Sequence, residues 1–235
     1  MIVAIIPARG GSKRIPEKNI RPFAGRPIMA YSIQAAQETG LFDQILVSTD
    51  SERIAEVALA CGAEVPFFRP ADLADDFTGT APVLLHALDW LQDRGGAVEA
   101  FCCIYPAAPL IKAHYICEGY RLLKEKRAAT AFSVTTFPYP IFRALRITEK
   151  GNLEMIWREY EERRSNDLPE TYHDAGQFYW GDAQRFREEK RLFSCDSVPV
   201  VLPRYLVQDI DTLEDWDVAE RLYRASHMPS PSQTD

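Results

Sequence analysis

A short segment near the N-terminus combines glycines with closely spaced basic residues. It reads Ala8-Arg9-Gly10-Gly11-Ser12-Lys13-Arg14-Ile15-Pro16-Glu17-Lys18-Asn19 and follows an apolar run, residues 2–7. Glycines let the backbone approach a ligand closely, and exposed N–H groups and basic side chains together bind phosphate oxygens. The segment therefore predicts a phosphate-binding loop after a buried strand, where open α/β sheets hold their ligands. A solvated basic turn is the alternative.

This loop does not match the common phosphate-binding motifs. It lacks the Gly-Lys-Ser/Thr ending of a P-loop and is not a Gly-x-Gly-x-x-Gly sequence, which disfavours a kinase, a GTPase or a dinucleotide-binding protein. The sequence also has no His-Glu-x-x-His or Gly-x-Ser-x-Gly motif, so zinc-protease and serine-hydrolase chemistry has no support.

Two aspartates near the C-terminus have the spacing of a metal site. Asp209 and Asp211 are two residues apart, so both side chains project to one face of an extended segment. Two carboxylates together with phosphate oxygens and water are a common Mg²⁺ site. Alternatively, these acids only stabilise the N-terminus of the helix that follows them. Because the chain also carries the basic loop, we favour the metal site.

The overall composition excludes several classes of protein. Of the 235 residues, 46% are hydrophobic and 26% are charged, which excludes a disordered or fibrous chain. The 27 basic and 34 acidic residues give a net charge of −7, which disfavours nucleic acid as a partner. No apolar stretch approaches the length of a membrane span, and the five cysteines form no Cys-x-x-Cys pair. We expect a cytoplasmic protein with reduced cysteines and no membrane partner.

Strand-like and helix-like segments alternate along most of the chain. Apolar runs predict strands over residues 2–7, 45–47, 65–68, 101–105, 130–135, 177–180 and 198–202. Apolar residues at helical spacing predict helices that begin near residues 27, 54, 83, 114 and 213, the last with Thr212 and Asp215 as a capping pair. This alternation predicts an α/β fold, a Rossmann-like, mostly parallel sheet flanked by helices.

The alternation breaks over residues 137–172, which contain prolines followed by a charged stretch. We expect this segment to be inserted as an excursion from a single domain that covers residues 1–226. The last residues, 227–235, are rich in proline and serine and are expected to form a disordered tail.

Several motifs resemble the CMP-sialate synthetase family of cytidylyltransferases. They cover residues 6–19, 25–28, 47–50, 69–73, 106–110 and 209–212, and the match extends over most of the chain. Pro106-Ala107-Ala108-Pro109-Leu110 departs at two small residues from the family's Pro-Thr-Ser-Pro-Leu loop. The resemblance implies a nucleotide-diphospho-sugar transferase-like fold. It also implies Mg²⁺-dependent joining of CTP to a nonulosonic acid, with release of pyrophosphate.

The resemblance also implies roles for individual residues. Arg9 and Lys13 would bind the triphosphate and stabilise the transition state. Asp209 and Asp211 would bind Mg²⁺, and Asp211 is expected to be essential for catalysis. For Arg69, a surface ion pair is the alternative to a nucleotide contact. The residues expected to contact the nucleotide are Ala8, Arg9, Gly10, Gly11, Ser12, Lys13, Asn19, Arg69 and Thr80.

The segment over residues 167–180 resembles the members of the family that use pseudaminic acid. Tyr105 stands where sialate synthetases carry Gln, and His173 stands where they carry Arg. These two residues and Gln177 are expected to contact the sugar, and His173 could also assist proton removal. A structural histidine is the alternative for His173. The product would supply a glycosyltransferase for bacterial surface glycans such as those on flagellin.

The resemblance leaves other substrates and one other class of function open. The sugar could instead be a sialic acid, legionaminic acid or Kdo. A nucleotide-binding module without catalysis is the alternative from a different class, although such a module need not retain both Asp209 and Asp211. Residues 137–172 resemble the family's dimerisation arm, so we expect a homodimer.

Overall fold

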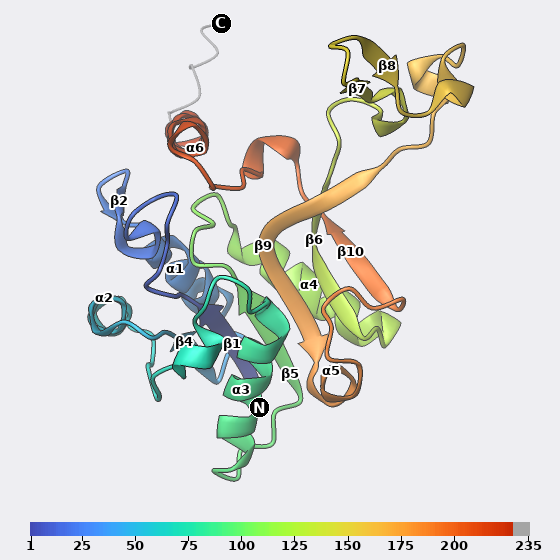
Figure 1. The fold of residues 1–235 in the computed structure, drawn as a ribbon. Helices are drawn as coiled ribbons and strands as arrows, with labels where there is room; N and C mark the ends of the chain where they lie inside the picture. The colour runs from blue at the N-terminus through green and yellow to red at the C-terminus, as the bar shows by residue number, and fades with distance from the viewer. Residues whose placement is uncertain (228–235) are drawn as a thin grey trace, which may run out of the picture.

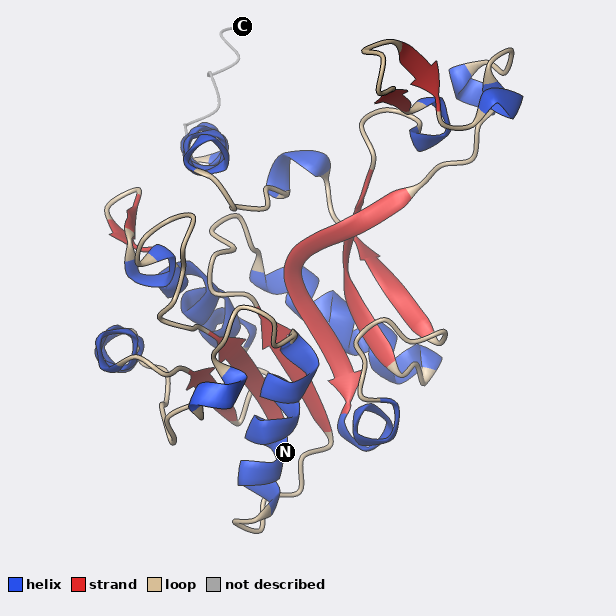
Figure 2. Cartoon of the chain, viewed as in Figure 1, coloured by secondary structure: helices blue, strands red, loops and turns tan. Residues whose placement is uncertain are grey.

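The computed structural model describes residues 1–227, and a six-stranded sheet forms its centre (Figures 1 and 2). The order of the strands across the sheet is β10-β6-β9-β5-β1-β4. Strand β1 pairs in parallel with β4 and β5, and β10 pairs in parallel with β6. The predicted mostly parallel sheet is therefore confirmed. The strands are β1 Ile2–Pro7, β4 Gln44–Ser48, β5 Ala100–Ile104, β6 Thr130–Thr136, β9 Tyr172–Asp182 and β10 Ser197–Val201.

Strand β9 is antiparallel to both of its neighbours, because the chain re-enters the sheet there after the segment that follows β6. It pairs antiparallel with β5 and β6, and its register with β6 shifts between Phe132 and Val134. The predicted strand over residues 177–180 is thus the buried part of a longer strand. The predicted strand over residues 65–68 is wrong: Glu64 and Phe68 make isolated bridges only. Pro66 lies between them and has no N–H to continue a ladder.

Helices cover both faces of the sheet (Figure 1). Alternate residues of a strand point to opposite faces, so each buried strand supplies two cores. Ala4 and Ile6 of β1 share one core with residues of α1, α2 and α4, whereas Val3 and Ile5 share the other with residues of α3 and α5. The helices are α1 Met29–Thr39, α2 Glu52–Ala60, α3 Thr80–Gln92, α4 Ala113–Lys126, α5 Ala183–Glu189 and α6 Leu213–Ser226.

Helix α6 packs on a small hairpin that follows the basic loop. Strands β2 (Pro22–Phe23) and β3 (Arg26–Pro27) form this hairpin, and the rings of Phe23 and Trp216 lie 5.5 Å apart. The capping box of Thr212 and Asp215 is present as predicted. The packing of α6 brings the segment before it, with the two predicted metal ligands, to the loop after β1.

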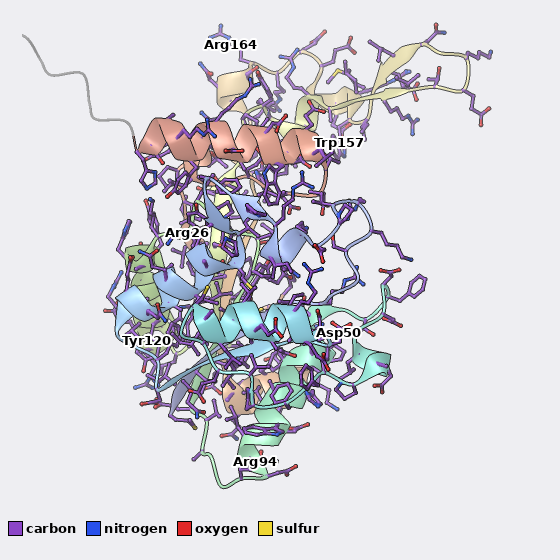
Figure 3. All side chains as sticks on the ribbon, turned by 90° about the vertical axis from the view of Figure 1, so that its left-hand side faces the viewer. Arg26, Asp50, Arg94, Tyr120, Trp157 and Arg164 are labelled. Atoms are coloured by element: carbon purple, nitrogen blue, oxygen red, sulfur yellow. The ribbon has the colours of Figure 1, made fainter. Side chains whose placement is uncertain are left out.

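Residues 137–171 leave the sheet between β6 and β9 and project from one end of the molecule (Figure 1). In the side view, Arg164 of this segment lies at the opposite end from Arg94 (Figure 3). The segment contains a short hairpin of β7 (Leu145–Ile147) and β8 (Leu153–Met155) and three single-turn helices, η3 Ile141–Arg143, η4 Arg158–Tyr160 and η5 Ser165–Asp167. Elsewhere the single turns are η1 Lys18–Ile20, η2 Ala71–Leu73 and η6 Arg204–Leu206.

Two further expectations concern the end of the chain and membranes. Of the predicted tail, His227 follows α6 directly, and residues 228–235 lie outside the described residues. Among the helices of residues 1–227, none has the length and apolar character needed to cross a bilayer.

Candidate active site

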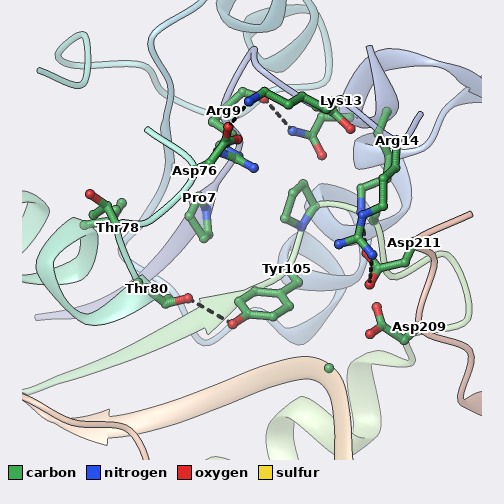
Figure 4. Close-up of a pocket in the computed structure, with 18 of the residues that line it drawn as sticks. Pro7, Arg9, Lys13, Arg14, Asp76, Thr78, Thr80, Tyr105, Asp209 and Asp211 are labelled. Atoms are coloured by element: carbon green, nitrogen blue, oxygen red, sulfur yellow. Dashed lines mark hydrogen bonds and ion pairs between the residues drawn. The ribbon is translucent and has the colours of Figure 1, made fainter. Parts of the chain in front are cut away.

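A cavity of about 530 Å³ lies at the carboxyl ends of β1 and β5 (Figure 4). Its walls come from the basic loop, the start of α3, the residues after β5 and the segment before α6. This is the edge at which parallel strands of an open α/β sheet present ligands. The cavity therefore brings together parts of the chain that lie far apart in the sequence.

The backbone of the basic loop is held in place by hydrogen bonds to the side chains of Asp50 and Asn19. The Gly10 N–H donates to Asp50 Oδ1 at 2.8 Å, and the Asn19 amide donates to the Arg9 carbonyl at 2.9 Å. A Cβ on Gly10 would lie 3.1 Å from the Ser51 Cβ, so a larger residue would push the loop away from α2. These contacts fix the direction in which Arg9 and the residues after it leave the sheet.

The predicted backbone cradle is only partly available in this structure. Ser12 lines the cavity, whereas Ala8, Gly10 and Gly11 do not. Ala8 is fully buried and its N–H donates to Ser48, while the N–H groups of Gly10 and Ser12 are already bonded to Asp50 and to the Gly10 carbonyl. Side chains rather than these amides therefore present most of the positive charge to the cavity.

Arg9 and Lys13 converge on one carboxylate at the basic end of the cavity. Arg9 pairs with Asp76 at 2.7 Å, and Lys13 pairs with the other oxygen of the same group. Hydrogen bonds from both cations lower the pKa of Asp76, so this carboxylate is ionised at neutral pH. Arg9, Lys13 and Asp76 all line the cavity, with Asn19 beside them.

Asp209 and Asp211 form the acidic end, on either side of buried Ile210. Both carboxylates line the cavity, and Asp211 pairs with Arg14 at 2.9 Å and with Lys18 at 3.6 Å. Burial, together with the nearby charge of Asp211, raises the pKa of Asp209. No third His, Cys, Asp or Glu joins them in a metal-binding group within residues 1–227.

The alternative role for this pair is to stabilise the N-terminus of α6, but Asp215 performs that role. Asp215 accepts hydrogen bonds from the N–H groups of Thr212 at 2.8 Å and Asp211 at 3.1 Å. The carboxylates of Asp209 and Asp211 are therefore not needed to cap α6 and remain directed at the cavity.

Arg69 is buried against Ser48 rather than lying on the surface. It is 6% exposed, its Nε donates to Ser48 Oγ at 3.1 Å, and a second nitrogen donates to the Ser48 carbonyl. The alternative of a surface ion pair is thus wrong. Burial lowers the pKa of this guanidinium, and the nearby charge of Asp50 opposes that effect. Arg69 lines the cavity, so its positive charge adds to that of Arg9 and Lys13 in the same cavity.

Tyr105 and Thr80 form the wall on the other side. Their hydroxyls are 3.0 Å apart, and the Tyr105 ring packs 5.2 Å from that of Tyr179. Thr80 is the first residue of α3, so the positive end of that helix faces the cavity. Burial raises the pKa of Tyr105 to about 12, which keeps its hydroxyl protonated and able to donate.

His173 and Gln177 do not line the cavity, which departs from the expected arrangement. His173 bonds the Asp174 carbonyl at 2.9 Å and packs against Phe137 at the base of the projecting segment. Gln177 is buried and donates to the Leu206 carbonyl at 2.5 Å. Gly176 lines the cavity instead. Gly176 has a φ of 62°, so the backbone departs from regular strand geometry at this point, and the Gln177 side chain is directed to Leu206 instead of the cavity.

Sequence reasoning missed several residues of this cavity. Asp76 was one of many acids, and nothing in its spacing indicated that it would meet Arg9 and Lys13. Arg14 and Lys18 were visible as charges in the loop, but their pairing with Asp211 depends on the packing of α6. Only its place in the chain pointed to Asp76, because residues 74–79 lie between two predicted contacts, Arg69 and Thr80.

The chain is similar in sequence and fold to several known proteins. The family model described as cytidylyltransferase matches residues 3–203. A pseudaminic acid cytidylyltransferase of Campylobacter jejuni is 42% identical, over 96% of this chain and 97% of that protein. A CMP-N,N'-diacetyllegionaminic acid synthase of Legionella pneumophila is 33% identical, over 94% and 95%. A solved structure of CMP:2-keto-3-deoxy-manno-octonic acid synthetase with CTP matches in fold, with a TM-score of 0.69, 13% identity and coverage of 96% and 99%.

Proposed function

Since this chain belongs to the cytidylyltransferase family, we propose that it joins CTP to pseudaminic acid, giving CMP-pseudaminic acid and pyrophosphate. The anomeric hydroxyl oxygen of the sugar acid forms a bond to the α-phosphorus of CTP. The bond from that phosphorus to the bridging oxygen breaks, pyrophosphate leaves and the hydroxyl proton is lost. The observation that carries the proposal is one cavity with cations at one end and a carboxylate pair at the other.

Arg9 and Lys13 would bind the triphosphate. Both are long cationic side chains that already converge on an anion in the cavity, the Asp76 carboxylate. A triphosphate carries more negative charge than one carboxylate, and further charge develops on the leaving pyrophosphate. Cations held in place before the reaction stabilise that charge most effectively. Asn19, Arg69 and Thr80 line the same cavity and would contact the nucleotide.

Asp209 and Asp211 would hold Mg²⁺. The raised pKa of Asp209 reflects burial and repulsion from the Asp211 carboxylate, and a divalent cation bound by these residues would relieve that repulsion. Two carboxylates, with the remaining positions taken by phosphate oxygens and water, are the donor set that Mg²⁺ prefers. The bound ion would neutralise charge on the reacting phosphates. Arg14 and Lys18 would hold the Asp211 side chain in place.

Pseudaminic acid is favoured over other nonulosonic acids by the 42% identity to an enzyme named for it, compared with 33% to a legionaminic acid enzyme. In the cavity itself, Tyr105 supports the choice, because an aromatic ring with one hydroxyl replaces the amide expected for a sialic acid. A pocket built for particular polar groups rejects a sugar that leaves them unpaired.

We also propose that the protein is a homodimer and that the projecting segment, residues 137–172, contributes to the interface. The hairpin on this segment exposes apolar side chains to solvent: Leu145 is 55% exposed, Ile147 74% and Leu153 66%. Contiguous exposed apolar residues are typical of a protein interface.

The test of the proposed reaction is pyrophosphate release from CTP and Mg²⁺, with pseudaminic, legionaminic, N-acetylneuraminic and Kdo acids offered separately. We expect turnover to be selective for pseudaminic acid. Turnover with another acid would keep the chemistry and reject the sugar. If no acid is turned over although CTP binds, the chain is a binding module and not an enzyme.

A further inference from the structure

Asp76 occupies the place where an anionic ligand would be expected. Its two carboxylate oxygens pair with Arg9 at 2.7 Å and with Lys13, and all three side chains line the cavity (Figure 4). A carboxylate held by two cations imitates one end of a bound phosphate group, since both present oxygens to the same donors. The described chain thus supplies its own anion to the predicted phosphate site.

The loop that carries Asp76 is ordered by its own hydrogen bonds. Asp75 Oδ1 accepts the N–H groups of Phe77 at 3.0 Å and Thr78 at 2.6 Å, and the Thr78 hydroxyl donates to the Asp72 carbonyl at 3.1 Å. Arg9 also donates to the Asp75 carbonyl at 2.6 Å. The turn therefore presents the Asp76 carboxylate to the cations at little further cost in conformational entropy.

The same loop leads directly into other residues of the cavity. Thr78 and Gly79 line it, and Thr80 begins α3. Phe77, at the tip of the loop, is 95% exposed, so nothing in residues 1–227 packs against it to hold the loop down. Asp76 can leave the cations without disturbing the core.

We propose that Asp76 is an intramolecular competitor for the polyphosphate and sets the affinity of the site for it. CTP displaces the Asp76 carboxylate from Arg9 and Lys13 on binding, and the carboxylate returns as pyrophosphate departs. The proposal rests on the proposed function, because it takes the two cations to be the polyphosphate site. Its consequence is that Asp76 weakens the binding of both substrate and product, which favours release of pyrophosphate.

The test measures binding of inorganic pyrophosphate and of CTP by isothermal titration calorimetry, with wild type and Asp76→Asn. The substitution removes the charge but keeps the shape. We expect both ligands to bind about two- to tenfold more tightly to the variant, since two exposed ion pairs need not be broken. The inhibition constant for pyrophosphate should fall by the same factor, and the melting temperature should stay unchanged.

Two further variants separate this effect from general changes in charge. Asp72→Asn also removes one negative charge from the same loop. Because Asp72 forms no ion pair within residues 1–227, this variant should bind pyrophosphate with the affinity of wild type. Asp76→Glu retains a carboxylate and should remain close to wild type. In a Lys13→Ala background, the gain from Asp76→Asn should shrink, because one of the two pairs is already absent.

The outcomes also distinguish this inference from the proposed function. Equal or weaker binding of pyrophosphate by Asp76→Asn, while wild type binds CTP, would show that Asp76 supports the cations and would overturn the inference alone. Failure of wild type to bind either CTP or pyrophosphate would overturn the proposed function and the inference with it.

Discussion

Ile15 of the basic loop and Ile210 of the segment before α6 lie in one buried cluster, although they come from opposite ends of the chain. Both are essentially inaccessible to solvent, and burial of each such side chain contributes about 1.5–3 kcal/mol. Lys18 strengthens this junction by donating to the Ile210 carbonyl at 2.7 Å. Because Ile210 points into the cluster, its neighbours Asp209 and Asp211 must point into the cavity.

The first prediction concerns Asp211. Asp211→Ala should lower kcat by about 100-fold or more, because it removes a charge that organises the reacting phosphates. CTP binding measured with a chelator present should change little or tighten slightly, since Arg14 and Lys18 lose an ion-pair partner. Pyrophosphate release and calorimetry measure the two effects. Asp217→Asn, an exposed charge on α6, is the matched control, and wild-type activity of Asp211→Ala would reject the metal assignment.

The second prediction separates the role of Lys13 in catalysis from any role in folding. Its side chain is 79% exposed, so Lys13→Ala should leave the melting temperature unchanged. The same substitution should lower kcat about 100-fold, because one cation is lost from the leaving group. Lys13→Arg should recover part of that rate. A variant with normal kcat would remove Lys13 from the mechanism.

The third prediction follows from the raised pKa of Asp209. A carboxyl with a raised pKa is protonated at a higher pH than usual, and a protonated carboxyl binds Mg²⁺ poorly. The apparent affinity for Mg²⁺ should therefore fall as the pH decreases from neutral through that raised pKa. Titrations of activity with Mg²⁺ at several pH values, at saturating CTP, measure this. An affinity independent of pH across the mildly acidic range would contradict it.

The raised pKa also predicts how Asp209 affects stability. Between the unfolded and the folded pKa of this residue, the native state binds more protons, so ionisation of Asp209 lowers stability as the pH rises through that window. Asp209→Asn should remove this contribution and make the metal-free protein slightly more stable above the window. Chemical denaturation of wild type and variant, with a chelator present, measures the difference. A less stable variant at neutral pH would show that the carboxylate has a structural role.

The fourth prediction concerns the oligomeric state. Leu153→Glu, on the hairpin of the projecting segment, should convert a dimer to a monomer in light scattering, because it places a charge in an apolar interface. Leu59→Glu on α2 is the matched control, since Leu59 is 58% exposed and Leu153 66%. If wild type is already a monomer at working concentration, the proposed interface is wrong.

The fifth prediction tests whether Tyr105 contacts the sugar acid. Tyr105→Phe retains the ring that packs on Tyr179 but removes the hydroxyl beside Thr80. We expect the KM for the sugar acid to rise about tenfold, because the sugar loses the hydroxyl group proposed to contact it. The KM for CTP should change much less. Equal changes in both KM values would place Tyr105 at the nucleotide instead.

The fold was largely predictable because its signals are local. The apolar run of β1, the helical spacing before Cys61 and the capping pair of Thr212 all act over a few residues. The direction of β9 was not predictable, because it depends on where the chain rejoins the six-stranded sheet after the projecting segment. The failed strand at residues 65–68 shows the same limit: apolar composition suited a strand, but Pro66 prevents a continuous ladder.

The candidate site was predictable where one motif carries the chemistry and not where distant segments meet. The basic loop and the pair of Asp209 and Asp211 could be found from spacing alone. The contact of Asp76 with Arg9 and the burial of Arg69 depend on tertiary packing. His173 and Gln177 were assigned to the sugar through the resemblance to the family, but His173 packs against Phe137 and Gln177 donates to the Leu206 carbonyl.

The pairing of Thr136 with Tyr172 joins the two ends of the projecting segment at one rung of the sheet. None of residues 137–172 lines the cavity. The segment therefore has the geometry of an exchangeable module, since a shorter or longer insertion could start and finish at this rung without moving the reacting groups. Grafting such segments between related chains would therefore change this end of the molecule while the residues that line the cavity stay the same.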